Sequence, residues 1–165
     1  MSAALSVWVS GIGLWAPGAS TWDAFRDVVS GGAPSGASER PVADVLPPNE
    51  RRRAPESVLL AAAAAGQAVR MSGRDAATLP CVFASAHGDQ VITDYMCQTL
   101  ATAPLELSPT KFHNSVHNAP AGYWTIATHF FGEPQFEQRI MTRKHLRFAT
   151  TWPSSTLRSI PLSTW

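Results

Sequence analysis

The chain has 165 residues, of which 45% are hydrophobic and 15% charged, and its formal net charge is +1. This length suits one domain with a sizeable core, and so small a charge gives no electrostatic case for binding nucleic acid or an anionic membrane. No apolar run approaches the roughly 18 residues of a membrane-spanning helix, no signal peptide is evident, and two cysteines are too few for a disulfide scaffold. We therefore expect a cytoplasmic protein with reduced thiols.

The first predicted element is a buried strand over residues 5–14, and its end overlaps the stretch Gly11-Ile12-Gly13-Leu14-Trp15-Ala16. This spacing fits the dinucleotide-binding pattern G-x-G-x-x-G/A, which needs a helix that begins at the glycines and holds a pyrophosphate on its amides. Pro17-Gly18 marks a turn there instead, and no acidic residue ends a second strand about 20 positions on, where a ribose would be bound. We therefore expect no cofactor and assign the glycines to close backbone packing.

Two helices with an irregular connection between them are predicted next. Ser20 or Thr21 can cap the first helix, and Gly31-Gly32 ends it. Residues 31–55 are rich in Pro, Gly, Ser and Arg and are expected to be irregular. Pro55 then opens the helix "ESVLLAAAAAGQAVRM", whose alanine run permits very close packing.

A second buried strand, Cys81–Ala86, is predicted to end at His87-Gly88-Asp89. A third helix follows over residues 90–103, and residues 104–118 form a polar loop. Asn118 then caps a fourth helix, which has Pro120 in its first turn.

The predicted fold class is α/β. Both predicted strands are continuously apolar instead of alternating, which is typical of strands buried on both faces. The sequence therefore favours a parallel or mixed sheet with helices on both faces, in which the strands 5–14 and 81–86 are adjacent or nearly so.

The composition changes after Thr128. Residues 1–128 contain 24 alanines, whereas residues 129–165 contain one, Ala149. Because the second stretch has weak periodicity, we expect it to contribute little to the core. We divide the chain into a domain over residues 1–128 and a divergent tail over residues 129–165. A frameshift in the gene and a poorly ordered tail are both open interpretations of the change in composition.

No metal site is expected from the histidines. His113 and His117 stand four apart, a spacing that places two ligands on one face of a helix. The segment is a predicted loop, however, and no third ligand stands out in the sequence. Hydrogen bonds that tie down a buried loop are the favoured role of these polar side chains.

The other candidates for chemistry also have structural interpretations. Cys81 and Cys97 lie in apolar predicted elements without a base nearby in sequence, and we interpret them as small hydrophobes. His87 and Asp89 form either a corner of a site or, as we favour, a capped turn. The run at residues 51–53, three arginines, either meets an acidic partner or is simply solvated. The sequence therefore does not indicate any set of residues arranged for catalysis.

Several stretches together resemble β-ketoacyl synthases. "VWVSGIGLWAPGASTWDAFRDVVSGG" is similar to their opening strand, turn and helix, "RRRAPESVLLAAAAAGQAV" to their arginine-led helix, and "LPCVFASAHGD" to their next core strand. "LSPTKFHNSVHNAPAGYWTIAT" resembles the short chain-length-factor type found with type II polyketide and aryl polyene pathways. The resemblance covers residues 5–128 and implies the N-terminal half of a thiolase-like fold, truncated, with a mixed sheet between helices.

The resemblance implies a subunit that is not active alone. In true synthases the nucleophilic cysteine follows the unit that corresponds to Asn118 onward, and the tail of this chain contains no cysteine. The two catalytic histidines belong to a C-terminal half that has no counterpart in this sequence. We therefore expect no catalytic residues and a heterodimer with a catalytic ketosynthase subunit, which meets acyl carrier protein indirectly during fatty acid or polyketide-type (aryl polyene) chain elongation.

Two alternatives to this subunit stay open. The first is a non-functional truncated fragment of such a protein. The second is an independent enzyme, either a condensing enzyme or a hydrolase that uses His87, His113 or His117. The absence of a placed nucleophile weighs against the enzyme.

The resemblance also indicates a subunit interface or a wall of the acyl-chain cavity. Aromatic side chains anchor such contacts because they bury a large area at modest entropic cost. The alternative is that Tyr123 and Trp124, the two aromatic residues of the predicted fourth helix, are ordinary core residues. The candidate residues are His113, Asn114, His117, Asn118, Tyr123 and Trp124.

Overall fold

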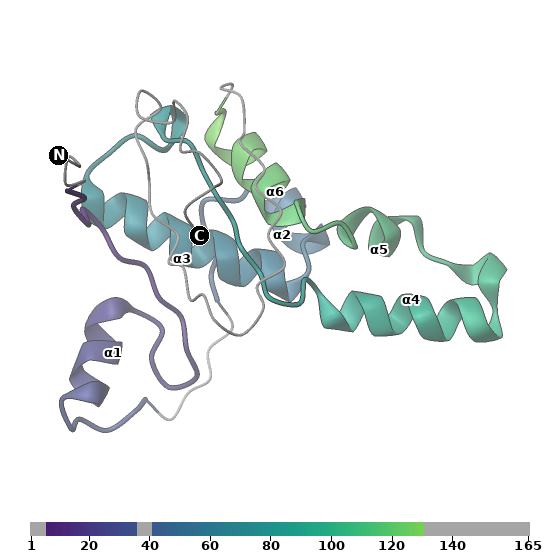
Figure 1. The fold of residues 1–165 in the computed structure, drawn as a ribbon, viewed down its shortest axis with the longest axis horizontal. Coiled ribbons are helices and arrows are strands. Elements are labelled where there is room, and N and C mark those ends of the chain that lie inside the picture. The colour runs from purple at the N-terminus through teal and green to yellow at the C-terminus, as the bar shows by residue number, and fades with distance from the viewer. Residues whose placement is uncertain (1–5, 36–40, 131–165) are drawn as a thin grey trace, which may run out of the picture.

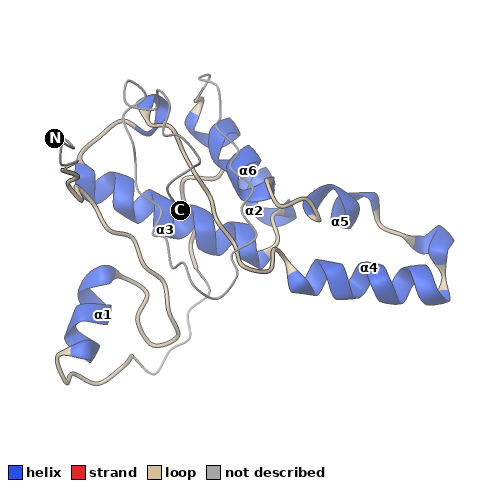
Figure 2. Ribbon diagram, viewed as in Figure 1, coloured by secondary structure: helices blue, strands red, loops and turns tan. Residues whose placement is uncertain are grey.

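A computed structural model describes residues 6–35 and 41–130, and this part of the chain is helical (Figures 1 and 2). Helix α3 runs through the body of the molecule, α6 packs on it, and α4 and α5 project together from one end. None of these helices is long and apolar enough to cross a membrane. The elements are α1 (Trp22–Val29), α2 (Pro48–Arg53), α3 (Glu56–Ser72), η1 (Ala76–Thr78), α4 (Gln90–Thr102), η2 (Pro104–Glu106), α5 (Pro109–Asn114) and α6 (Ala119–Thr128).

The predicted α/β fold with a mixed sheet is wrong for the residues that the structure describes. Neither residues 6–14 nor residues 81–86 form a strand there, and the N-terminal half of a thiolase-like fold is not what these residues adopt (Figure 2). The one β-type pairing within the described ranges is an isolated antiparallel bridge between Ala16 and Ala19, which closes the turn at Pro17-Gly18.

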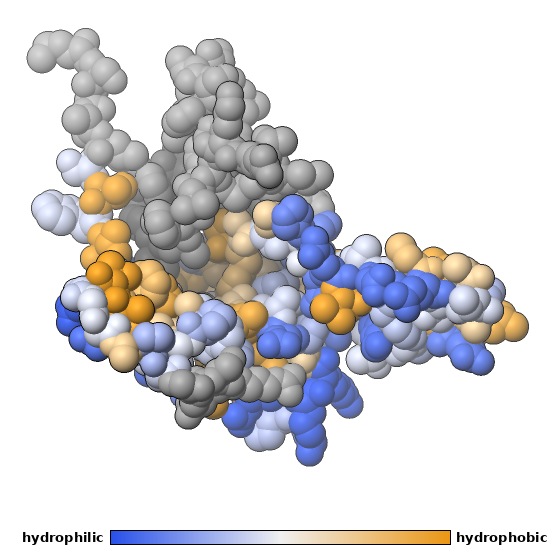
Figure 3. Space-filling model, turned by 90° about the horizontal axis from the view of Figure 1, so that it is seen from below, coloured by the Kyte–Doolittle hydropathy of each residue, from blue (hydrophilic) through white to orange (hydrophobic). Residues whose placement is uncertain are grey.

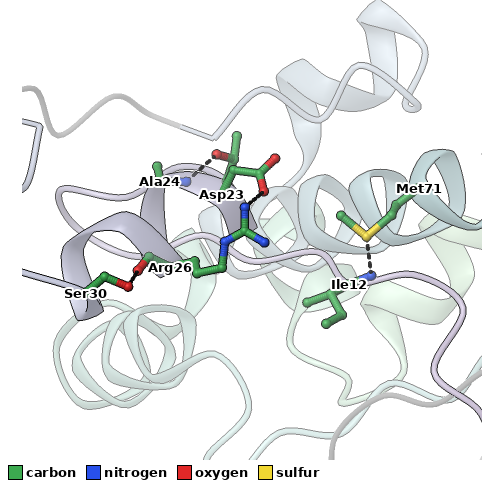
Figure 4. Close-up of polar contacts among 7 residues, drawn as sticks. Ile12, Asp23, Ala24, Arg26, Ser30 and Met71 are labelled. Carbon is green, nitrogen blue, oxygen red and sulfur yellow. Dashed lines mark hydrogen bonds and ion pairs between the residues drawn. The ribbon is translucent and has the colours of Figure 1, made fainter. Parts of the chain in front are cut away.

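The opening segment pairs with a helix instead of a strand. A Cβ atom on Gly11 or Gly13 would collide with the backbone of α3, so these glycines allow the two backbones to touch. The amide of Ile12 donates to Sδ of Met71 at 3.2 Å (Figure 4), and that of Leu14 donates to Oε1 of Gln67 at 3.3 Å. Because α3 supplies the acceptors that a neighbouring strand would supply, no ladder forms here. Close backbone packing at the glycines is confirmed.

Several apolar residues of the predicted strands are correspondingly exposed. Val7, Trp8 and Val9 are open to solvent, and Val82 in the second segment is 43% exposed. Without a sheet, no second layer covers these side chains within the described ranges.

The predicted helices are present, and their caps explain why. Thr21 Oγ1 accepts the amide of Ala24 at the start of α1 (Figure 4), and Gly73 ends α3 with a φ of 66°. Two further helices, α2 and α5, lie in stretches that we predicted to be irregular. Both begin with a proline at the first helical position, Pro48 and Pro109, where proline is favoured and not disruptive.

The core lies between α3, α6 and the segment that precedes α3. The alanines of α3 allow close approach of its neighbours, and Tyr123 of α6 packs into the same cluster. The prediction that the tail contributes little to this core concerns residues 129–165, of which 131–165 lie outside the described residues. The buried residues of the cluster are Ala43, Leu46, Ala54, Val58, Leu59, Ala62, Ala63 and Tyr123.

Candidate functional site

Two of the candidate residues are joined by a buried hydrogen bond. Tyr123 on α6 donates its hydroxyl to Oδ1 of Asn114 at 3.1 Å, and Nδ2 of Asn114 donates to the backbone carbonyl of Arg53 at 3.2 Å. Asn114 is the last residue of α5, so its side chain fastens that helix to α6 and to the end of α2. Burial raises the pKa of Tyr123, which therefore remains a protonated donor at neutral pH.

Trp124 lies next to this link and is 3% exposed. Its ring meets that of Phe83 edge-on, with centroids 6.2 Å apart, and it lines an open cavity of about 210 Å³ beside α3. The ion pair between Arg70 and Asp44, at 3.1 Å, lies at the same cavity. This volume falls below the roughly 300–1,000 Å³ of ordinary small-molecule sites. Tyr123 and Trp124 are thus buried within the chain, as the core alternative expects.

The other three candidates, His113, His117 and Asn118, are exposed. The ring of His117 lies against Gly88, where an added Cβ would come within 2.8 Å of Nδ1. Gly88 has a φ of 65°, a left-handed conformation that favours glycine. The structure therefore places His117 beside the turn 87–89, two features that the sequence analysis treated separately.

Asp89 joins the beginnings of two helices. Its Oδ1 accepts the amide of Ile92 at 2.9 Å and caps α4, while its Oδ2 accepts the hydroxyl of Ser57 on α3 at 2.6 Å. The capped-turn interpretation is confirmed. Sequence reasoning missed Ser57, because its partner lies 32 residues away and no local pattern marks the pair.

The cysteines and histidines do not assemble a reactive centre in the described ranges. Burial raises the pKa of the Cys81 thiol, which disfavours the thiolate that nucleophilic catalysis needs. Cys97 is exposed on α4, so its interpretation as a small hydrophobe among apolar neighbours is wrong. Across residues 6–35 and 41–130, no group of three or more His, Cys, Asp or Glu residues is placed to hold a metal ion.

Helices α4 and α5 form a projecting pair, which we call the helical arm (residues 90–114) (Figure 1). The arm is held by its own contacts. Nζ of Lys111 lies 3.6 Å from the centre of the Tyr95 ring, and the Tyr95 hydroxyl accepts the amide of Ser108 at 3.1 Å. Only one residue of α4, Ile92, is buried.

Apolar side chains are exposed on parts of the arm and just beyond it, and Figure 3 shows orange residues beside blue and white ones on the projection at the right. They lie on α4, on η2, on α5 and in the turn after α5. Phe112 and Val116 flank His113 and His117, but the sequence analysis did not select them, because a predicted loop gives no face to which they would belong. The exposed apolar residues are Val91, Leu100, Leu105, Phe112 and Val116.

Comparison with known protein families gives one match. The family model described as "Beta-ketoacyl synthase, N-terminal domain" matches residues 22–133, which include the helical arm and all six candidate residues. No curated protein matches the chain.

Proposed function

The chain belongs to the family of β-ketoacyl synthase N-terminal domains, and we propose that it serves ketosynthase-type chain elongation as a non-catalytic subunit of the chain-length-factor type. Its partner in this proposal is a catalytic ketosynthase, through which it meets acyl carrier protein. The elongation in this proposal is of the fatty acid or polyketide type, and the resemblance of residues 107–128 points to the aryl polyene kind. The observation that carries the proposal is the family match over two thirds of the chain, from residue 22 to residue 133.

The state of the cysteines supports a non-catalytic role. A ketosynthase nucleophile is a thiolate, stabilised by its surroundings. Cys81 is half-buried with a raised pKa, and Cys97 is exposed on the helical arm. Both precede Asn118, whereas the resemblance puts the nucleophile after the unit that begins there.

The helical arm supports a role in binding a partner. Four exposed apolar residues lie on the arm and Val116 lies just beyond it, which is a large amount of apolar surface beside two helices that bury only Ile92 and Asn114. The link from Asn114 to Tyr123 fixes α5 on the body, so the arm is presented in one orientation. Exposed aromatic residues such as Phe112 are typical anchors of protein interfaces.

Co-expression with the ketosynthase of the same pathway tests the partner. We expect a stable complex on size exclusion, and we expect Phe112→Lys to weaken it at least tenfold. Val29→Lys is the matched control, because Val29 is 70% exposed but lies on α1, away from the arm. A folded chain that forms no complex would favour the alternative of a non-functional fragment.

Incubation with a reactive acyl donor tests the chemistry. We expect no acyl-enzyme by intact mass. Acylation that survives Cys81→Ser together with Cys97→Ser would establish another nucleophile and an independent enzyme, which contradicts the proposal.

A further inference from the structure

The helical arm is joined to the body by few contacts within residues 6–35 and 41–130 (Figure 1). Helices α4 and α5 pack on each other and make little contact with the helices of the body. Their buried residues lie at the two ends of the arm, since Ile92 is in the first turn of α4 and Asn114 is the last residue of α5. The direction in which the arm projects therefore depends on what holds these ends.

Both ends are bonded to the same short junction, residues 53–57, between α2 and α3. At the end of the arm, Nδ2 of Asn114 donates to the backbone carbonyl of Arg53 at 3.2 Å. At its beginning, Oδ2 of Asp89, the cap of α4, accepts the hydroxyl of Ser57 at 2.6 Å. The arm is thus anchored at two points on one junction of the body.

The two anchors differ in kind. Asn114 is buried and also bonded to Tyr123, so its anchor belongs to the core. Ser57 and Asp89 are half-buried, and their bond has the length of a hydroxyl donating to a carboxylate, which is stronger than a bond between neutral groups. Because Asp89 also caps the amide of Ile92, its position determines where the first turn of α4 begins.

We propose that Ser57 is a positioning residue, which sets the direction of the helical arm by holding Asp89 at the beginning of α4. Two anchors limit how far the arm can turn, whereas the Asn114 anchor alone leaves it free to turn about one point. The consequence for a ketosynthase rests on the proposed function: an arm already held in one direction loses less entropy when it binds.

Distances between two spin labels test the proposal on the full chain without any partner. Cys97 is a native labelling site exposed on α4, and Arg74→Cys provides a second exposed site beyond the end of α3. Cys81→Ser removes the remaining thiol, and we call this doubly labelled chain the labelled parent. In double electron–electron resonance we expect one narrow distance distribution for the labelled parent. After Ser57→Ala we expect a distribution roughly twice as wide, because one anchor is lost.

Two control variants separate positioning from a general loss of structure. Ser57→Thr keeps the hydroxyl and should keep the narrow distribution. Ser115→Ala removes a hydroxyl whose bond, to the carbonyl of Phe112 at 2.7 Å, does not reach the body, so it should also keep the narrow distribution. Alanine is a good helix former, so Ser57→Ala should retain the circular dichroism spectrum of the parent. An unchanged width for Ser57→Ala, or equal broadening in either control, would overturn the proposal.

Binding to a ketosynthase is measured separately, so that the two proposals can fail independently. We expect Ser57→Ala to bind roughly tenfold more weakly than the labelled parent, since the arm must then be ordered on binding. Ser57→Thr should bind as the parent does. A parent that binds no ketosynthase, but whose distance distribution broadens after Ser57→Ala, would contradict the proposed function and still support the role of Ser57.

Discussion

The body around α3 and the helical arm are built from helices of comparable length but differ in what they bury. Helix α3 buries Val58, Leu59, Ala62, Ala63 and Gly66, whereas α4 buries Ile92. Burial of apolar area is the main source of folding free energy. Stability is therefore concentrated in the body, and the apolar residues of the arm are available for binding.

The largest effect is expected in the body, at Trp124. Trp124→Ala removes a buried ring that packs against Phe83, and we expect a loss of about 3–5 kcal/mol in the free energy of unfolding. Urea denaturation followed by circular dichroism measures it. A loss below about 1 kcal/mol would mean that the ring is not part of a well-packed core.

A smaller loss is expected where the opening segment meets α3. The Cβ introduced by Gly13→Ala collides with the carbonyl of Ala64, which belongs to a helix backbone and cannot easily move. We expect a loss of about 1–3 kcal/mol in the free energy of unfolding, the usual cost of overpacking.

Gly122→Ala is the matched control for this substitution. Gly122 lies within α6, and no atom stands within 4 Å of an added Cβ. We expect this variant to be stabilised by up to about 1 kcal/mol, because alanine is the better helix former. Equal effects of the two substitutions would contradict the packing of residues 11–14 on α3.

Tyr123→Phe separates the hydrogen bond from the packing of the ring. Loss of the hydroxyl leaves Asn114 without its donor, and we expect a cost of about 1–2 kcal/mol at neutral pH. Burial raises the pKa of Tyr123 in the folded state. The protonated Tyr123 side chain therefore contributes its full stabilisation below about pH 10, the pKa of a free tyrosine.

That contribution is lost as the pH rises through the higher pKa of the folded state, since only the unfolded chain ionises easily there. The unchanged chain should therefore lose stability more steeply than Tyr123→Phe above pH 10, in urea titrations at stepped pH. Parallel pH profiles for the unchanged chain and Tyr123→Phe would show that Tyr123 does not titrate as a buried group.

The helices were predictable from the sequence because their signals are local. Thr21 and Asp89 cap helices within three residues of themselves, and Gly73 follows the last turn of α3. The short helices were missed because proline was interpreted as a break, although Pro48 and Pro109 stand at the one helical position that proline favours.

That the two predicted strands do not form in the described residues could not be predicted, because a strand requires a partner that its own residues do not specify. The apolar run at Val7–Val9 indicates a need for burial but not what provides it. For the same reason, the pairs Ser57–Asp89 and Tyr123–Asn114 depend on how the helices meet. Only the choice of Asn114 as a polar residue that ties down its segment was available from the sequence.

The smallest effect on stability is expected on the arm, at Phe112. Its side chain is 58% exposed, so Phe112→Ser should change the free energy of unfolding by less than about 0.5 kcal/mol. The same substitution removes an exposed aromatic ring, so it should weaken the proposed binding to a ketosynthase while the denaturation curve stays in place. Trp124→Ala, with its large loss of stability, is the opposite case. A loss above about 1 kcal/mol for Phe112→Ser would show that the arm depends on this ring for its own folding, which would end the distinction between a body that stabilises and an arm that binds.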